Sequence, residues 1–329
     1  MRPLTYQRAA GVEDAVSLLA AAPTGAFLAG GTTEVDLIRA GVSHTDHLVD
    51  INALPLAGVA HMPDGGLQIG ALARMSEVAR TPAVVERYPA ISQSLLLSAS
   101  EQLRNMASMG GNMCQRTRCP YLRDGISPCN KREPGSGCAA LDGLNRGHAI
   151  LGTSQHCIAT HPSDVAVPLV AFDAVVQTTG SGSDRSIPID DFFLLPGDTP
   201  ELEHPLAHGE LIVSIDIPGA AVARRSTYLK VRDRQSYEFA LVSVAAAVAV
   251  TDGIVTDVRL AWGGIGTKPW RARRAEAALI GGRADHDAYQ QAAALELEDA
   301  DVRGHNAFKV ELAQRATVRA LTQSMNGVQ

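Results

Sequence analysis

The residues best suited to chemistry are five cysteines, all of which lie between Cys114 and Cys157 of a 329-residue chain. Their spacing is C-x4-C-x9-C-x8-C-x18-C, which is neither the C-x2-C-x2-C run of ferredoxins nor the paired C-x2-C of zinc ribbons. Thiolates from scattered loop positions can still converge on one site after folding, and they suit iron–sulfur clusters and zinc. The alternative is a set of buried free thiols, which behave as small hydrophobic side chains.

The part of the chain that carries these cysteines, residues 113–160, is also rich in cations, and we call it the cysteine segment. Positive side chains would stabilise the net negative charge of a thiolate-ligated site. Residues 108–160 show little helical or strand periodicity, so we expect an ordered loop insertion that something must hold in place. The cations are Arg116, Arg118, Arg123, Lys131, Arg132 and Arg146.

Two glycine-rich turns precede the cysteines. The first, Gly30-Gly31-Thr32-Thr33, joins a predicted strand to a predicted helix, and the second is Gly110-Gly111 within SMGGN. Glycines let the backbone approach a phosphate, and the start of a helix offers free N–H donors. Neither turn has the GxGxxG pattern, so the dinucleotide-binding fingerprint of Rossmann proteins is absent. Each turn alone would also suit an ordinary tight connection; together they indicate phosphate binding.

The surrounding pattern predicts α and β elements in alternation, followed by a strand-rich region with helices at its end. Before the cysteines we expect helices at 12–22, 32–41 and 87–107, strands at 26–31 and 47–51, and a hairpin at 56–72. After them we expect a helix at 165–172, strands at 173–179, 210–218, 226–232, 238–250 and 254–264, and helices at about 271–281, 284–298 and 305–324. A boundary at 219–225 separates two domains, 1–220 and 225–327.

Composition narrows the class of protein. The hydrophobic fraction is 46% and the charged fraction 19%, a globular balance, and the net charge of −6 argues against nucleic-acid binding. No apolar run is long enough for a transmembrane helix, and the N-terminal residues lack the apolar core of a signal peptide. We therefore expect a soluble protein in which disulfides are not the default reading of the cysteines.

Six stretches of the chain resemble one family, the FAD-binding subunit of molybdenum hydroxylases, which includes xanthine dehydrogenases and aldehyde oxidoreductases. The resemblance runs from about residue 3 to 325. The cysteine strings are similar to a subset whose FAD subunit carries an additional [4Fe-4S] cluster, found in bacterial aldehyde oxidoreductases. The stretches are AGGTTEVDLIRAG, QLRNMASMGGN, QRTRCPYLRD, CNKREPGSGCAALDGLNRGHAILG, CIATHPSD and YLKVRDRQSYEFALVSVAAAVA.

The resemblance implies an α+β protein with the vanillyl-alcohol-oxidase (PCMH) type of FAD-binding fold. Two α/β subdomains hold FAD, and a C-terminal α/β domain like that of the CO dehydrogenase flavoprotein packs against them. The first turn would wrap the pyrophosphate, although Thr33 stands where the family usually has Asp or Asn. The implied pyrophosphate residues are Phe27, Leu28, Ala29, Gly30, Gly31, Thr32, Thr33, Glu34 and Val35.

The remaining flavin contacts are also implied by the resemblance. Asp164 would contact the ribityl or adenosine side of the cofactor, while Ile212 and Lys230 would lie near the isoalloxazine ring, where a lysine can stabilise negative charge. The second turn and the residues after it would contribute Ala107, Ser108, Gly111, Asn112, Gln115 and Thr117.

For the [4Fe-4S] cluster the resemblance implies Cys119, Cys129, Cys138 and Cys157 as ligands. Cys114 is left out because the family generally has an aliphatic residue there; if that is wrong, Cys114 replaces Cys119. Nearby His148, His156 and His161 are interpreted as structural.

The implied function is electron transfer, and no catalytic residue is assigned within this chain. A large partner subunit with a molybdenum cofactor would oxidise an aldehyde, and a small partner with two [2Fe-2S] clusters would pass electrons to FAD here and on to an external acceptor. Alternatives are the FAD subunit of a hydroxybenzoyl-CoA reductase-like or xanthine dehydrogenase-like enzyme, and a zinc-stabilised, non-enzymatic interaction protein. The expected compartment is the cytoplasm, with the periplasm, reached by co-export with a partner, as the alternative.

Overall fold

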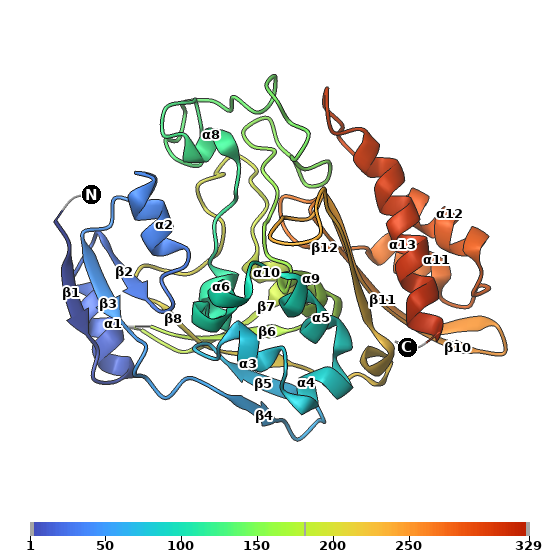
Figure 1. The fold of residues 1–329 in the computed structure, drawn as a ribbon, viewed down its shortest axis with the longest axis horizontal. Helices are drawn as coiled ribbons and strands as arrows, with labels where there is room; N and C mark the ends of the chain where they lie inside the picture. Colours follow the sequence, from blue (N-terminus) through green and yellow to red (C-terminus); the bar gives the residue numbers. More distant parts are fainter. Residues whose placement is uncertain (1–2, 181, 327–329) are drawn as a thin grey trace.

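The computed structural model describes residues 3–180 and 182–326 and contains three β-sheets, of three, five and four strands (Figure 1). We call them the N-terminal, central and C-terminal sheets. The N-terminal sheet lies at one end of the molecule and the C-terminal sheet with its helices at the other, with the central sheet between them. One sheet for each α/β unit matches the arrangement expected from the sequence.

The N-terminal sheet is parallel and has the order β1-β3-β2. Its strands are β1 (Thr5–Arg8), β2 (Gly25–Leu28) and β3 (His47–Asp50), and its helices are α1 (Val12–Ala20) and α2 (Glu34–Arg39). Parallel strands need a crossover connection, which α1 supplies between β1 and β2. Ala15, Val16 and Leu19 of α1 pack with Val49 of β3 in a small core.

The central sheet is antiparallel and draws its strands from distant parts of the chain. In order these are β4 (Val59–His61), β5 (Leu67–Gly70), β8 (Leu211–Ile217), β6 (Val175–Thr179) and β7 (Arg185–Pro188). The accompanying helices are α3 (Met75–Val78), α4 (Pro82–Arg87), α5 (Pro89–Leu97), α6 (Glu101–Met106), α7 (Met109–Met113), α9 (Ala166–Ala171) and α10 (Ile189–Phe192). Several of these helices contribute to one core with the inner face of the sheet.

The C-terminal sheet follows the short 3-10 helix η1 (Ala221–Arg225) and has the order β12-β11-β10-β9. Its strands are β9 (Thr227–Val231), β10 (Val242–Thr251), β11 (Ile254–Gly263) and β12 (Trp270–Arg271), and its helices are α11 (Arg273–Leu279), α12 (His286–Glu296) and α13 (Phe308–Asn326). Strand β10 is buried on both faces: Val244 and Val248 join the core beneath these helices, while Ala245 and Ala247 join the core of the central sheet. Small alanines on the second face let the two domains pack closely.

The cysteine segment lies at the top of Figure 1 and has little regular structure. Its one helix beyond the end of α7 is α8 (Pro120–Arg123), and isolated bridges join Cys129 to Cys138 and Leu151 to Gly266. The expected ordered loop insertion is therefore present, and its last part is attached to the C-terminal domain.

Two sequence-based expectations about the elements need correction. The helix expected at 87–107 is two helices, because the chain breaks at residues 98–100, where Ala99 has φ +45° and the Ser100 side chain accepts from the Leu103 N–H and starts α6. Strands β1 and β7 were not expected, since both are short and largely exposed and so lack an apolar pattern. No helix in residues 3–180 or 182–326 has the length and apolar character needed to cross a membrane.

Candidate functional site

A cleft of about 980 Å³ lies where the first glycine turn faces α6, α7 and β9. Its walls combine segments that are far apart in the sequence, including the turn after β2, the start of α7 and the residues before α9. Most of the residues predicted to bind the cofactor line it: Phe27, Leu28, Ala29, Gly30, Gly31, Thr32, Thr33, Glu34, Ala107, Ser108, Gly111, Asn112, Gln115, Asp164 and Lys230.

The first glycine turn packs backbone against backbone. A Cβ atom on Gly30 would lie 1.9 Å from the Met106 carbonyl oxygen, and Gly31 has φ +70°, a conformation that favours glycine. The Asn52 side chain donates to the Ala29 carbonyl at 2.9 Å and so holds the turn from the β3 side. The glycine pair is thus required by the close approach of two chain segments at the cleft.

The second glycine turn is held by polar side chains. Ser108 precedes α7 and its Oγ accepts from the Gly111 N–H at 3.3 Å. The Asn112 side-chain oxygen accepts from Ser163 Oγ at 2.5 Å and from Gln115 Nε2 at 3.0 Å. These bonds connect the turn to the residues that lead into Asp164.

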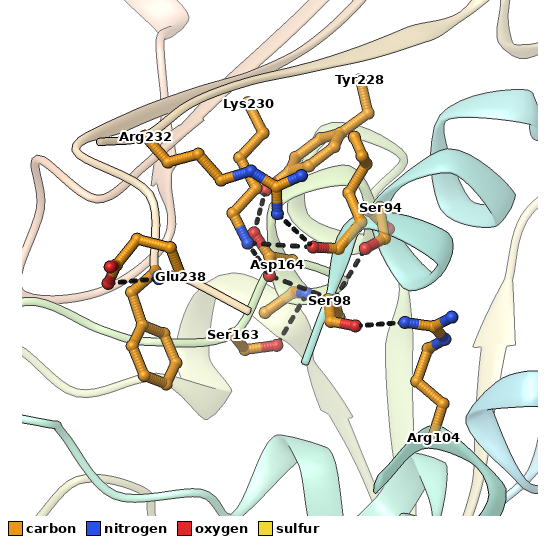
Figure 2. Close-up of polar contacts among 12 residues, drawn as sticks. Ser94, Ser98, Arg104, Ser163, Asp164, Tyr228, Lys230, Arg232 and Glu238 are labelled. Carbon is orange, nitrogen blue, oxygen red and sulfur yellow. Dashed lines mark hydrogen bonds and ion pairs between the residues drawn. The ribbon is translucent and has the colours of Figure 1, made fainter. Parts of the chain in front are cut away.

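Asp164 is the centre of a buried polar network, shown in Figure 2. Its carboxylate accepts from Lys230 Nζ at 2.8 Å, from Tyr228 Oη at 2.7 Å and from Ser98 Oγ at 3.1 Å. Burial, with Asp164 adding to it, raises the pKa of Tyr228 well above its ordinary value. The Lys230 side chain is 1% exposed and forms an ion pair with Asp164. The negative charge of Asp164 therefore partly cancels the positive electrostatic potential of Lys230 in the cleft.

Three predicted cofactor residues do not line the cleft. Val35 is 39% exposed, Ile212 lies in the core of the central sheet, and Thr117 is buried with its hydroxyl on the Thr160 carbonyl at 2.9 Å. Thr117 Oγ1 also accepts from the Cys119 N–H at 3.3 Å, so this residue joins the cleft side of the cysteine segment to the first predicted cluster ligand.

Other cleft residues were not among those predicted. Arg116, Arg118 and Arg123 were noted only as a basic group near the cysteines, yet all three line the cleft, and Arg118 lies over the Phe239 ring at 5.4 Å. Their clustering with glycine turns was the available signal. Nothing in the sequence pattern pointed to residues 201–204 and 206–210, which also line the cleft.

Many of the cations of the cysteine segment are paired. Arg118 and Arg123 both pair with Asp36 of α2. Arg116 and Lys131 both pair with Glu203, at 2.6 and 3.1 Å. Burial alone would raise the pKa of Glu203, but the two cations outweigh it and lower that pKa. The basic group is therefore a set of ion pairs that connects the segment to both walls of the cleft.

A second, small cavity is lined by Cys119, Cys129, Cys138 and Cys157, the four cysteines predicted as ligands, while Cys114 lies in the wall of the cleft. Burial raises the pKa of Cys119 to about 12 and that of Cys157 to about 11, so these thiols carry their protons at neutral pH. Within the described ranges, no three Cys, His, Asp or Glu side chains already form a site for a single metal ion.

His148 contacts one of these cysteines, with Nε2 3.2 Å from Cys119 Sγ. Burial and the nearby charge of Lys309 lower the pKa of His148 to about 4, which keeps the ring neutral. His161 is partly buried and packs edge-on against Phe193, whereas His156 is half exposed and lies 3.4 Å from Asp198. Of these three histidines, only His148 presents a ring nitrogen to a cysteine.

Solved structures define the class of fold. The chain resembles a carbon monoxide dehydrogenase from Hydrogenophaga pseudoflava that lacks the Mo-pyranopterin moiety of its cofactor, with a TM-score of 0.75 and 23% identity, covering 99% of this chain and 98% of that one. It also resembles quinoline 2-oxidoreductase from Pseudomonas putida 86, with a TM-score of 0.76 and 21% identity over 99% and 98% of the two chains. The expected fold, with its flavoprotein-like C-terminal domain, is confirmed.

Sequence comparisons define the family. Residues 2–220 match the FAD binding domain in molybdopterin dehydrogenase, and residues 227–324 match the CO dehydrogenase flavoprotein C-terminal domain. The aldehyde oxidoreductase FAD-binding subunit PaoB of Escherichia coli (strain K12) is 44% identical over 326 residues, which is 98% of this chain and 99% of PaoB. The chain therefore belongs to the FAD-binding subunits of the molybdenum hydroxylase family and is a subunit of an oxidoreductase.

Proposed function

We propose that this chain is the electron-transfer subunit of a molybdenum-containing aldehyde oxidoreductase and that it binds FAD in the cleft and a [4Fe-4S] cluster in the cysteine cavity. The observation that carries the cluster assignment is the gathering of four cysteines, spread from Cys119 to Cys157, around one cavity in a segment with almost no regular structure. The aldehyde as substrate class is proposed from the 44% identity to an aldehyde oxidoreductase subunit over nearly the whole chain.

The cleft fits FAD through its glycine turns and its arginines. At the two turns the backbone approaches closely and offers N–H groups, which suits the pyrophosphate at Gly30, Gly31, Thr32 and Ser108. Asp164 and Lys230 lie at the part of the cleft nearest β9, where the isoalloxazine or ribityl portion would lie. Bound FAD supplies the capacity to take up electrons singly and release them in pairs.

The cysteine cavity offers four thiols, one for each iron atom of a [4Fe-4S] cluster. Each thiolate of a [4Fe-4S] cluster binds a different iron atom, so the four sulfurs surround a cage and need not converge on one point. The four thiols line one common cavity, as the ligands of such a cage would. The ion-paired cations around the segment limit the net charge that it presents.

The partners follow from the relatives. Several relatives are medium chains of multi-subunit enzymes, such as the carbon monoxide dehydrogenase medium chain of Hydrogenophaga pseudoflava. We propose a large partner with a molybdenum cofactor, which oxidises the aldehyde, and a small partner with two [2Fe-2S] clusters, which delivers the electrons. An external acceptor receives them. The compartment is the cytoplasm, or the periplasm if a partner carries the chain there.

The test is the absorption spectrum and the iron and zinc content of the complex purified with its partners. We expect flavin bands on a broad iron–sulfur shoulder and about four more iron atoms per flavin than two [2Fe-2S] clusters supply. Cys129→Ser should remove the excess iron, and Cys114→Ser, the matched cysteine of the cleft wall, should retain it.

Other outcomes would change the proposal. Loss of excess iron in Cys114→Ser but not in Cys119→Ser would replace one ligand by the other. Zinc in place of iron, or absence of flavin, would overturn the electron-transfer assignment in favour of a structural metal site. Oxidation of a purine in place of an aldehyde would move the complex to the xanthine dehydrogenase-like alternative, and reduction of a hydroxybenzoyl-CoA to the reductase-like one.

A further inference from the structure

Lys309, in the first turn of α13, is a fully buried lysine whose polar contacts are all with backbone oxygens. Its Nζ donates to the carbonyl oxygens of Gly147 at 3.0 Å, His148 at 2.9 Å and Gly264 at 2.7 Å. Three carbonyl acceptors match the three N–H donors of an ammonium group, whereas a neutral amine has only two. Burial lowers the pKa of Lys309 to about 7, but the three carbonyl acceptors, two in the cysteine segment and one at Gly264, favour the charged ammonium form.

The residues just before α13 bind the same stretch of the cysteine segment. The His305 N–H donates to Asn145 Oδ1 at 3.0 Å, and Asn306 Nδ2 donates to the Ala149 carbonyl at 3.1 Å. Ile150 then enters the core of the C-terminal domain. The C-terminal domain thus fixes the backbone of residues 145–150 by several independent contacts.

His148 lies within this fixed stretch and contacts Cys119, one of the four cysteines that line the cavity. Its side chain is buried, Nε2 is 3.2 Å from Cys119 Sγ, and Nδ1 has no hydrogen-bond partner among the described residues. A metal-bound thiolate has no proton to give, so the hydrogen in this contact must belong to Nε2. Nδ1, which has no hydrogen-bond partner, then carries no hydrogen. Burying an unpartnered acceptor nitrogen costs less free energy than burying an unpartnered N–H donor.

We infer that His148 and Lys309 are positioning residues that set the reduction potential of the cluster. His148 donates an N–H hydrogen bond to the sulfur of Cys119, and Lys309 fixes His148 and adds a buried positive charge behind it. This inference rests on the proposed [4Fe-4S] cluster. When one electron arrives from a partner [2Fe-2S] cluster, no bond to the ligands forms or breaks and no proton moves. The hydrogen bond and the charge stabilise the more negative, reduced form and so raise its potential.

The experiment is a potentiometric titration of the complex, followed by electron paramagnetic resonance, on His148→Leu, His148→Gln and Lys309→Met. We expect the four-iron midpoint to move to more negative potential in His148→Leu and in Lys309→Met. In His148→Gln, which retains an N–H donor, it should stay near the wild-type value. The midpoints of the two [2Fe-2S] clusters in the partner are the internal reference, and His286→Leu, whose exposed ring lies 3.3 Å from Asp287 in α12, is the matched control.

The outcomes separate failure of the cluster assignment from failure of the role proposed for His148. Absence of a four-iron signal from the wild-type complex would overturn the proposed cluster itself. If that signal is present, three results would overturn the role of the hydrogen bond. They are an unchanged midpoint in His148→Leu, equal shifts in the leucine and glutamine variants, and loss of the four irons from both variants. Loss of the irons from the leucine variant alone would support it.

Discussion

The cleft and the cysteine cavity lie in the same chain but are built in different ways. The cleft is formed at the ends of regular elements: the turn between β2 and α2, the residues between α6 and α7, and strand β9. The cysteine cavity is formed within a segment whose regular structure is limited to α8 and the end of α7. The glycine turns of the cleft are therefore positioned by secondary structure, although irregular residues complete its walls, whereas the cysteine cavity depends on contacts that hold an irregular chain.

The two kinds of construction place different demands on the side chains. At the cleft, glycine is needed because backbone segments approach each other, as Gly30 and Met106 do. In the cysteine segment, long polar side chains bind carbonyl groups that no strand or helix satisfies: Arg132 Nη1 donates to the Tyr121 and Leu122 carbonyls, and Lys309 Nζ to those of Gly147 and His148. A buried carbonyl without such a partner would destabilise the segment.

The largest effect is expected at the cleft, for Gly30→Val. The added side chain would overlap the Met106 carbonyl, and overpacking of this kind costs about 3 kcal/mol. We expect flavin occupancy to fall by more than about tenfold, since about 1.4 kcal/mol corresponds to a factor of ten in affinity. The measurement is the flavin-to-protein ratio of the purified complex.

Gly304→Ala is the matched control for that variant, because an added Cβ at residue 304 meets no atom within 4 Å. Retention of the excess iron in Gly30→Val would sharpen the comparison by showing that the two sites are independent. Full flavin occupancy in Gly30→Val would contradict the close approach on which the cleft depends.

An intermediate effect is expected for Glu203→Gln, which removes the negative partner shared by Arg116 and Lys131. Leaving two partly buried cations without a carboxylate should lower the free energy of unfolding by about 2–3 kcal/mol. Because the pKa of Glu203 is lowered by folding, its contribution is present above the ordinary glutamate pKa of 4.5 and is lost as the pH falls below it.

Thermal unfolding of Glu203→Gln and the wild type at neutral and acid pH would measure this. Glu133→Gln, at an exposed position of the same segment, is the control and should unfold as the wild type does. Because Glu203 joins the cysteine segment to the cleft, we expect both flavin and iron to be lost more readily. Loss of one cofactor only would show that the ion pairs do not couple the two regions.

The smallest effect is expected for Asp50→Asn, at the end of β3. Hydrogen bonds from Tyr6, Asn52 and Arg8 outweigh the effect of burial and lower the pKa of Asp50 to about 2. The stabilisation is present above the ordinary value of 3.8 and is lost as the pH falls through about 2. We expect a loss of about 1 kcal/mol at neutral pH and converging stabilities in acid.

Denaturant unfolding across this pH range is the measurement for Asp50→Asn, with the exposed Asp142→Asn as the control. Asn52 connects Asp50 to the Ala29 carbonyl, so flavin affinity should change only slightly. A loss of flavin as large as that of Gly30→Val would show that the first turn depends on β3 as much as on its own glycines.

The sequence predicted the regular elements better than the site geometry. Apolar periodicity located β8, β10, β11 and the three C-terminal helices, because each buries a continuous face. The break at residues 98–100 was missed because Leu95 and Leu103 keep a helical spacing across it. The cause is a tertiary contact: the break directs Ser98 Oγ to Asp164, 66 residues away, which no local pattern encodes.

Residue type predicted a cleft residue only where the backbone around that residue itself requires a particular amino acid. Gly30 and Gly31 stand out in the sequence because few residues tolerate their surroundings. Arg118 lies in the cleft because Asp36 of α2 accepts from it, a pairing that depends on how the cysteine segment is folded back onto the N-terminal sheet. Likewise, His148 was interpreted as structural. Its contact with Cys119 could not be predicted, because the backbone at His148 is bound by Lys309, which is far along the chain.

Strand β10 has a consequence for how the chain unfolds. Its alanines and valines point alternately into two cores, so the C-terminal sheet contributes to the cores of both domains. A chain cut at residues 221–225 would expose Ala245, Ala247 and Ala261 on one fragment and the matching surface of α9 on the other. The two domains should therefore unfold in a single cooperative transition. We expect neither domain to be stable when it is expressed without the other.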